Sequence, residues 1–276
     1  MSKDYDENLE ENENEIDVDN DDEKEENKKG LRIILIIIGI VLIVFGAVRL
    51  GYYVYSQYNA KQESEQYTEV TSETQETVKN PVDFPSLQKK NDEIYAWLKV
   101  PGTKVDYPVV QSSKDDAFYL KHSALTKKWA ASGAIYTEMV NSKAFDDRVT
   151  VIYGHNGYSD TMFTTLHNFE KKSFFDKHPK FYIYTPDSKL TYEIVSAFKY
   201  DNRHIMNSFD FRDNNAYNDF ITMIQNPAST VKNVRKDLDK SLTLNDNIVV
   251  LSTCFTNQRS NRYLVCGVLV KNEKTD

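Results

Sequence analysis

Cysteine is nearly absent from this sequence, with two residues in 276. Cys254 and Cys266 could close one disulfide, but a single pair twelve residues apart is not the framework that small secreted domains use. The chain has no C-x-x-C motif and no cluster of His and Cys, which argues against a structural zinc site. Outside a cell, an isolated thiol therefore needs a chemical reason to exist.

Glycine and proline are also scarce, with nine and seven residues. No Gly- or Pro-rich linker and no internal repeat divides the globular part of the chain, which argues against repeat architectures. A glycine-rich phosphate loop and a basic nucleic-acid patch are missing as well. We therefore expect no cofactor, no metal and no nucleic-acid partner.

Negative charge is concentrated at the N-terminus. Residues 1–29 contain 14 acidic residues and four lysines, a net charge of −10 against −8 for the whole chain. Because this segment has almost no apolar side chain to bury, we predict a disordered acidic tail.

An uncharged apolar run, Ile33–Val48, follows the tail. With its flanking residues it passes the roughly 20 residues that a bilayer-spanning helix needs. Arg32 and Arg49 can reach the two membrane interfaces. The run is longer than that of a signal peptide, and no A-x-A cleavage pattern follows it. We predict a retained transmembrane anchor over residues 30–55.

Basic residues on the two sides of the run indicate its orientation. Lys28, Lys29 and Arg32 precede it, whereas Arg49 and Lys61 follow it. This excess favours a cytoplasmic N-terminus and an extracellular remainder, in a protein that crosses the cell membrane once.

Two segments follow the predicted anchor. Residues 56–80 are polar and lack apolar periodicity, so we interpret them as a stalk. Residues 81–276 are enough for one domain of ordinary size, which we expect outside the cell.

The domain is predicted to be mostly β. Apolar runs predict strands at 105–111, 131–136, 148–154, 181–185, 190–200, 247–254 and 262–270. Helical spacing predicts helices at 86–100, 160–178 and 215–225. Pro108 favours an edge position for the first strand. Many strands with few helices indicate a mostly antiparallel sheet that closes toward a barrel.

Cys254 ends one of the strongest strands, in the run VVLSTCF at 249–255. Alternation places Val250, Ser252 and Cys254 on one face, so the thiol lies at the rim where a polar loop begins. This position suits a nucleophile that meets a substrate from outside, and it also suits an ordinary half-buried cysteine. A reactive thiolate also needs a positive charge and a proton partner nearby.

Candidates for both partners are present. If the last two strands form a hairpin, Arg262 lies beside Cys254, where its charge can favour the thiolate and stabilise an oxyanion; Arg259 in the loop is the rival. Among five histidines, only His155 repeats the rim position of Cys254, because it directly follows the strand at 148–154. The others lie in predicted helices or polar stretches: His122, His167, His178 and His204.

These motifs resemble the sortases, membrane-anchored cysteine transpeptidases of Gram-positive bacteria, and class B of that family most of all. The resemblance covers nearly all of residues 81–270. It rests, in order, on VPGTKVDYPVVQ (100–111), DDAFYL (115–120), YGHNGYSDTMFTTLHNF (153–169), the helix at 214–226, VLSTCF and RYLVCG. A helix ahead of the first strand and a helix inserted between the last strands point to class B.

The resemblance implies an eight-stranded sortase β-barrel with peripheral helices, preceded by one transmembrane helix. It implies that Cys254 is the nucleophile, His155 the general acid/base and Arg262 the oxyanion-stabilising group. Arg262 is preferred to Arg259 because RYLVCG continues as the last strand of the family.

The resemblance also implies a substrate site and a reaction. Ser252, Tyr119 and Leu120 match positions near the substrate groove. Such an enzyme cleaves a C-terminal sorting motif of secreted proteins after Thr, forms a thioacyl intermediate and joins the protein to an amine of a cell-wall peptide or peptidoglycan precursor. Thr256 stands where some relatives carry Asp, which leaves a Cys–His–Arg set without a carboxylate helper.

Three alternatives stay open at this point. The first is a hydrolytic cysteine peptidase, although papain-like enzymes place Cys before His and the caspase motif is missing. The second is a non-enzymatic or inactive surface binding domain, in which Cys254, His155 and Arg262 would not converge. The third is a pilus-polymerising sortase, against which the lack of Pro and Asp in residues 56–80 counts.

Overall fold

The structure is a computed structural model and describes residues 14–68, 79–157 and 159–276. The chain divides into one unit up to Tyr55 and a second unit from Ser56 onward.

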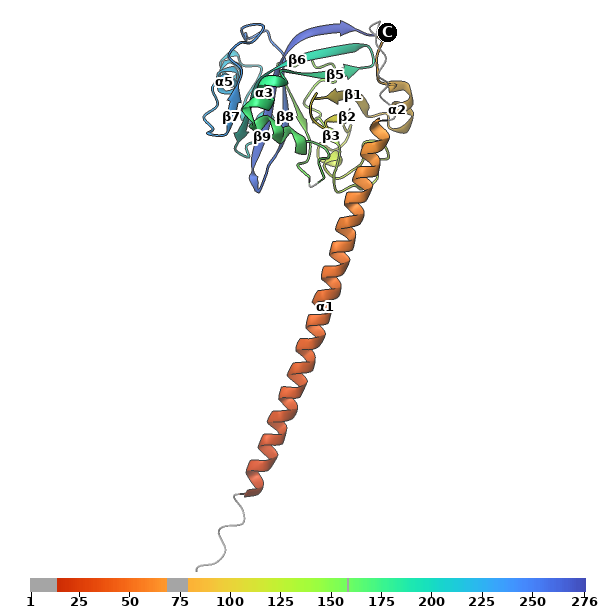
Figure 1. The fold of residues 1–276 in the computed structure, drawn as a ribbon, viewed down its shortest axis with the longest axis vertical. Coiled ribbons are helices and arrows are strands. Elements are labelled where there is room, and N and C mark those ends of the chain that lie inside the picture. Colours follow the sequence, from red (N-terminus) through yellow and green to blue (C-terminus); the bar gives the residue numbers. More distant parts are fainter. Residues whose placement is uncertain (1–13, 69–78, 158) are drawn as a thin grey trace, which may run out of the picture. The chain divides into compact units, whose positions relative to one another are not determined.

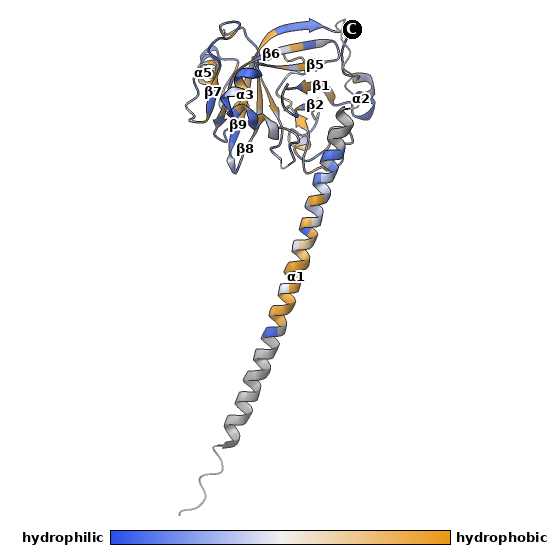
Figure 2. Ribbon diagram, viewed as in Figure 1, coloured by the Kyte–Doolittle hydropathy of each residue, from blue (hydrophilic) through white to orange (hydrophobic). Residues whose placement is uncertain are grey.

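Helix α1 (Asn14–Thr68) contains the apolar run. Its segment Ile34–Asn59, 26 residues, is long and apolar enough to cross a membrane. At 1.5 Å per residue it measures about 39 Å, more than the ~30 Å of a hydrocarbon core. Figure 2 shows the apolar residues gathered in this part of α1, and the large apolar side chains there are exposed.

The helix extends beyond the predicted anchor on both sides. It begins at Asn14, so residues 14–29, which the composition predicts to be disordered, are helical, and it ends at Thr68 inside the predicted stalk. Glu, Lys and Gln are good helix formers, and a helix already nucleated by the apolar run adds residues at little cost. Residues 1–13 of the tail and 69–78 of the stalk lie outside the described residues.

The second unit contains the predicted eight-stranded barrel, which is confirmed (Figure 1). Around the barrel the strands follow the order β5 (Lys180–Thr185), β1 (Ile94–Lys99), β2 (Asp106–Val110), β3 (Ile135–Tyr136), β4 (Val149–Tyr153), β8 (Ile248–Phe255), β9 (Gln258–Lys274) and β6 (Ser188–Tyr200). Pairing of β6 with β5 closes the barrel, and β7 (Lys232–Val234) extends the same edge of β6. The β2–β3 and β4–β8 pairs are parallel, and the other pairs are antiparallel.

The helices lie outside the barrel. They are α2 (Phe84–Lys90), η1 (Phe118–Leu120), η2 (Thr164–Glu170), α3 (Lys172–Lys177), α4 (Ile205–Ser208) and α5 (Asn214–Gln225), where η marks a 3₁₀ helix. Figure 1 shows α5 and α2 on opposite sides of the barrel. The helix predicted at 160–178 is instead two short helices, η2 and α3, that meet at Lys171.

The helix predicted at 86–100 is wrong over its second half. Helix α2 ends at Lys90, Asn91 caps it, and Ile94–Lys99 forms strand β1. The apolar spacing of Leu87, Ile94 and Leu98 fits a helix, but β1 pairs with strands on both sides and its side chains are almost all buried. Tertiary pairing has overridden the local pattern.

Strand β2 is not the edge strand that Pro108 predicted, but Pro108 itself lacks a strand partner on one side. Strand β2 lies between β1 and β3 in the barrel. However, β3 pairs only with Val109 and Val110, so Pro108 faces no strand partner on that side. This is where a sheet tolerates proline.

Alternation along the strands separates two cores. In β8, Val249 and Leu251 belong to the larger cluster, which the barrel encloses. Ile248 and Val250 belong to a second cluster on the outer face, together with Phe220 and three more buried residues of α5. The barrel wall is therefore buried on both faces where α5 covers it.

Gly267 in β9 is required by close packing inside the barrel. A Cβ at this position would lie 2.8 Å from Cζ of Phe181 and 3.2 Å from Cβ of Tyr192, two rings that stack with centroids 5.1 Å apart. We expect Gly267→Ala to destabilise the fold by about 1–3 kcal/mol, because this ring pair has no room to shift. Denaturant unfolding of the full chain in detergent measures the difference.

A matched control is Gly157→Ala, where the nearest atom to the added methyl group would be 3.6 Å away. Equal stability of Gly267→Ala and Gly157→Ala would contradict the packing described here.

Candidate active site

Two parallel strands end side by side at the candidate site. In the β4–β8 pair, Tyr153 is in register with Ser252, and the Gly154 amide donates to the Ser252 carbonyl at 3.1 Å. Neighbouring strands are about 4.8 Å apart, and parallel neighbours point in the same direction. His155 and Cys254, each two residues beyond the matched pair, therefore emerge at the same end of the barrel.

Gly154 is the residue at which the chain leaves β4, and neighbouring side chains pack directly against its Cα. A Cβ there would lie 2.6 Å from Cδ1 of Ile135 and 2.7 Å from the ring of Phe163. Only glycine allows these neighbours to approach so closely, and His155 follows at once.

Strand β9 brings Arg262 to the other side of β8. The antiparallel register pairs Cys254 with Arg262, which confirms the predicted hairpin, and the register then shifts between Cys254 and Phe255. Such β-bulges reorient side chains and are common beside active sites. Nη1 of Arg262 donates to the Asn261 carbonyl at 3.3 Å. The side chain of the rival, Arg259, lies outside the described part of the structure.

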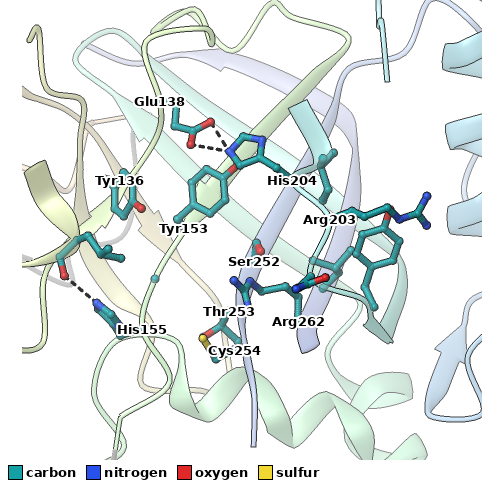
Figure 3. Close-up of a pocket in the computed structure, with 16 residues that line it drawn as sticks. Tyr136, Glu138, Tyr153, His155, Arg203, His204, Ser252, Thr253, Cys254 and Arg262 are labelled. Atoms are coloured by element: carbon teal, nitrogen blue, oxygen red, sulfur yellow. Dashed lines mark hydrogen bonds and ion pairs between the residues drawn. The ribbon is translucent and has the colours of Figure 1, made fainter. Parts of the chain in front are cut away.

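A pocket of about 260 Å³ joins the three predicted catalytic residues (Figure 3). Ser252 and Leu120 also line it. Cys254 shares its strand face with Val250, so the pocket lies on the outer face of the barrel wall, next to the part that α5 covers. The thiol is half-buried, as the rim position predicts.

The ring of His155 is held by the backbone. Its Nε2 donates to the Leu120 carbonyl at 2.7 Å, the dashed contact beside His155 in Figure 3. A carbonyl oxygen can only accept, so Nε2 carries a proton and Nδ1 is the nitrogen that can take up a second one. Leu120 thus contributes both a pocket wall and the orientation of His155.

Tyr119, predicted to be near the substrate, does not reach the pocket. Its side chain is fully buried. The hydroxyl donates to Glu93 Oε2 at 2.6 Å and accepts from Asn91 Nδ2 at 2.8 Å. Burial raises the pKa of Tyr119, and the neighbouring Glu93 carboxylate raises it further. The residue anchors η1, which carries Leu120, to the beginning of β1.

A carboxylate–imidazole pair occupies another part of the pocket wall and was not predicted. His204 Nε2 donates to Glu138 Oε1 at 2.8 Å, and the Tyr153 hydroxyl donates to Glu138 Oε2 at 3.4 Å (Figure 3). Burial, followed by the Glu138 charge, raises the pKa of Tyr136 to about 12. No sequence pattern marked this pair, because Glu138 and His204 are 66 residues apart in polar segments.

Two further side chains contact the Cys254 backbone and were also missed. Asn156 Nδ2 and His167 Nε2 each lie 3.1 Å from the Cys254 carbonyl oxygen. The helical position of His167 had argued against a role, yet η2 directs its ring at the end of β8. The conspicuous YGHN and LHNF segments could have suggested both residues.

The second cysteine is separate from this site. Cys266 is buried beneath α5 and pairs with Val250, so it forms no disulfide with Cys254. Burial strongly raises the pKa of its thiol. Among the described residues, no group of three or more His, Cys, Asp or Glu side chains is placed to hold a metal ion.

Comparison with known proteins agrees with this geometry. Residues 98–270 match the Sortase domain family. Sortase B of Listeria monocytogenes is 30% identical over 186 residues, which cover 67% of this chain and 72% of the relative. The crystal structure of sortase B from Bacillus anthracis superposes with a TM-score of 0.67 at 26% identity, covering 79% and 99% of the two chains. A Staphylococcus aureus sortase B–substrate complex gives a TM-score of 0.61 at 25% identity, covering 78% and 96%.

A closed barrel of this topology with cysteine, histidine and arginine at one rim defines a cysteine transpeptidase of the sortase type. The chain belongs to the sortase family. Its similarity to sortase B proteins in both sequence and structure places it in class B.

Glu93 gives a pH-dependent test of how the wall near His155 is held. Burial disfavours its charge, but hydrogen bonds from Tyr119, Ser113 and Lys127 outweigh this effect and lower the pKa from 4.5 to about 2. A carboxylate with a depressed pKa stabilises the fold above its unfolded pKa and loses this effect as the pH falls toward the folded pKa. We expect the free energy of unfolding to decrease from pH 4.5 to about 2, and Glu93→Gln to be less stable at neutral pH with a flatter decrease.

Urea unfolding at a series of pH values measures this dependence. Asp92→Asn is the control, because Asp92 binds the same Lys127 but is 85% exposed, and a surface pair contributes little. An unchanged pH profile in Glu93→Gln would contradict the assignment.

Proposed function

We propose that this class B sortase cleaves a C-terminal sorting motif of secreted proteins after Thr and joins the new carboxyl end to a cell-wall amine. The observation that supports it most is that Cys254, His155 and Arg262 line one pocket: Cys254 and Arg262 are paired between β8 and β9, and His155 follows the end of β4. A surface binding domain without enzymatic activity would not need these groups together.

The first half-reaction acylates the enzyme. Nδ1 of His155 takes the thiol proton of Cys254, and the thiolate attacks the Thr carbonyl of the motif. Arg262 donates to the oxyanion of the tetrahedral intermediate, where a fixed positive charge is most effective. The His155 imidazolium then protonates the leaving amine, the C–N bond breaks and a thioester remains on Cys254.

The second half-reaction transfers the acyl group. An amine of a wall peptide or its precursor attacks the thioester carbonyl, and His155 accepts the proton that this amine loses. Arg262 again faces the oxyanion, and the Cys254 thiolate leaves as the new amide forms. Acid/base and electrostatic chemistry by this chain's own side chains account for each step.

The pocket wall supports a role in binding the sorting motif. Ser252 and Leu120 line the pocket beside the thiol. A solved structure with the same fold, the Staphylococcus aureus sortase B–substrate complex, is of a protein bound to its substrate. Tyr119 is assigned to the support of η1 instead, because its hydroxyl is used by Glu93 and Asn91.

We also propose that α1 anchors the enzyme with its N-terminus in the cytoplasm. The apolar segment Ile34–Asn59 is long enough to span the bilayer. Lys28, Lys29 and Arg32 lie on the N-terminal side of the span, where cytoplasmic basic residues are favoured. The barrel then lies outside the cell, where secreted proteins and wall peptides are found.

Activity measurements test the assigned roles. We expect Cys254→Ala to abolish cleavage of a sorting-peptide panel, His155→Ala to lower kcat by about 10²–10⁴-fold and Arg262→Ala by about 10²–10³-fold. Cys266→Ala is the control: its thiol is buried away from the pocket, so cleavage should persist. Cleavage that survives in Cys254→Ala would refute the role of this thiol.

The acceptor decides between transfer and hydrolysis. Product analysis by mass spectrometry should show a thioacyl adduct on Cys254 and a ligated product when a wall-peptide amine is added. Cleavage that is indifferent to amines would instead identify a peptidase, and transfer only to a pilin lysine would identify a pilus polymerase.

Protease treatment of intact cells tests the orientation. With an epitope tag at each end of the chain, the C-terminal tag should be digested and the N-terminal tag protected. Protection of the C-terminal tag would show that the orientation is reversed.

A further inference from the structure

An imidazole that the proposed chemistry does not use lies directly behind the nucleophile. The side chain of His167 is only 14% exposed. Its ring stacks on Tyr263 with centroids 4.9 Å apart and meets Phe255 edge to face at 5.7 Å. One ring nitrogen faces the Cys254 carbonyl at 3.1 Å, and the other, Nδ1, lies 2.5 Å from Glu170 Oε1. Both nitrogens of a mostly buried ring are therefore engaged.

Asn156 connects this ring to the loop of the general acid/base. Its Nδ2 donates to the Cys254 carbonyl and to Thr256 Oγ1, both at 3.1 Å, and lies 3.1 Å from His167 Nε2. Asn156 directly follows His155 in the chain. One amide thus ties the segment that carries His155 to the peptide that carries the nucleophile.

The place of these contacts explains why they are needed. The register shift between Cys254 and Phe255 interrupts the β8–β9 ladder just beyond the thiol. A bulge lets the backbone turn, but it also removes the regular hydrogen bonds that fix a peptide plane. At this bulge the side chains of Asn156 and His167 hold the Cys254 carbonyl.

Glu170 fixes which ring nitrogen of His167 carries a proton. A carboxylate oxygen only accepts, so Nδ1 carries a proton. Nε2 bonds the Cys254 carbonyl only when it also carries a proton, because two acceptors cannot bond to each other. When Nε2 is unprotonated, it accepts from Asn156 Nδ2, and Asn156 alone donates to the Cys254 carbonyl. The ring is therefore joined to the Cys254 carbonyl either directly or through Asn156.

We propose that Asn156, His167 and Glu170 form a positioning unit that fixes the Cys254 thiol relative to His155. In this unit Glu170 orients His167, His167 supports Asn156 and the Cys254 carbonyl, and Asn156 joins the two catalytic segments. The proposal rests on the proposed roles of Cys254 and His155, and these three residues touch no reacting atom.

Core packing alone does not account for this arrangement. A phenyl ring at position 167 would stack on Tyr263 equally well. Unlike the imidazole, it would not bring polar atoms into a mostly buried site, where polar atoms cost free energy unless they are hydrogen-bonded. His178 shows a merely structural imidazole in the same chain: it packs on Phe174 at 4.0 Å and its Nδ1 contacts the Phe174 carbonyl at 2.9 Å, away from the pocket.

Four variants of the full chain, studied in detergent, separate positioning from packing. His167→Phe keeps the stacked ring and loses both nitrogens, whereas His167→Gln keeps an amide that can donate and accept. Glu170→Gln removes the charge that orients the ring. His178→Phe is the matched control for loss of an imidazole that binds a backbone carbonyl.

We expect His167→Phe to lower kcat about 10–100-fold with KM within about twofold, because a misplaced nucleophile slows chemistry more than binding. His167→Gln should recover part of this loss. Glu170→Gln should lower kcat less, because its amide oxygen can still accept from Nδ1 of His167. His178→Phe should keep the wild-type kcat.

Alkylation of Cys254 by iodoacetamide gives a readout that does not depend on any peptide substrate. At about pH 7 the rate constant should fall roughly tenfold in His167→Phe and stay unchanged in His178→Phe, since thiolate reactivity depends on correctly placed neighbours. Cys266 is buried and serves as the internal unreactive thiol.

The outcomes are distinct. A His167→Phe variant with the wild-type alkylation rate and kcat would overturn the positioning unit. The same holds if His178→Phe lowers kcat and the alkylation rate as much as His167→Phe does, or if His167→Gln recovers none of the kcat lost in His167→Phe. If the wild type cleaves no sorting peptide, the proposed function fails, and the alkylation rates still decide whether the unit positions the thiol.

Discussion

The parallel pairing of β4 with β8 is the constraint on which the active site depends. A register that matches Tyr153 with Ser252 places His155 and Cys254 at equivalent positions, each two residues past the matched pair. A shift by one residue would turn one of these side chains to the opposite face of the sheet. The apolar cores on both sides of the barrel wall fix this register, so the burial of Val249 and Val250 on opposite faces also determines where His155 and Cys254 lie.

Coverage by α5 distinguishes the chemistry of the two cysteines. Both lie on the outer face of the same strand pair, and Cys266 is in register with Val250, four residues before Cys254. At about 3.3 Å per residue this separates them by about 13 Å along the strands, too far for a disulfide. Beneath the helix, burial raises the pKa of the Cys266 thiol and leaves it inert, whereas Cys254 lies just past the covered region, in a pocket with Arg262.

Much of the fold, and the meeting of Cys254, His155 and Arg262 in one pocket, could be predicted from sequence, because strong strands and strand-end motifs are local signals. The hairpin at 181–200, strands β4, β8 and β9 and helix α5 follow from apolar alternation and spacing. Strand β1 was mistaken for a helix because its pairing with β2 and β5 is not visible locally. For the same reason Glu138–His204 and Asn156–His167 were missed: each pair forms only when distant segments meet. Tyr119 was placed by resemblance, and only the structure shows that its hydroxyl is used by Glu93.

The hydrogen bond from His155 to the Leu120 carbonyl has a kinetic consequence. In the proposed reaction the carbonyl occupies Nε2, so a single nitrogen delivers the proton to the departing amine and later receives one from the incoming amine. Both amines therefore use the same position in turn, and the first product has to diffuse away before the acceptor enters. We then expect double-displacement kinetics, in which reciprocal plots for the two substrates give parallel lines. The released peptide and the acceptor would compete for the same acylated form of the enzyme.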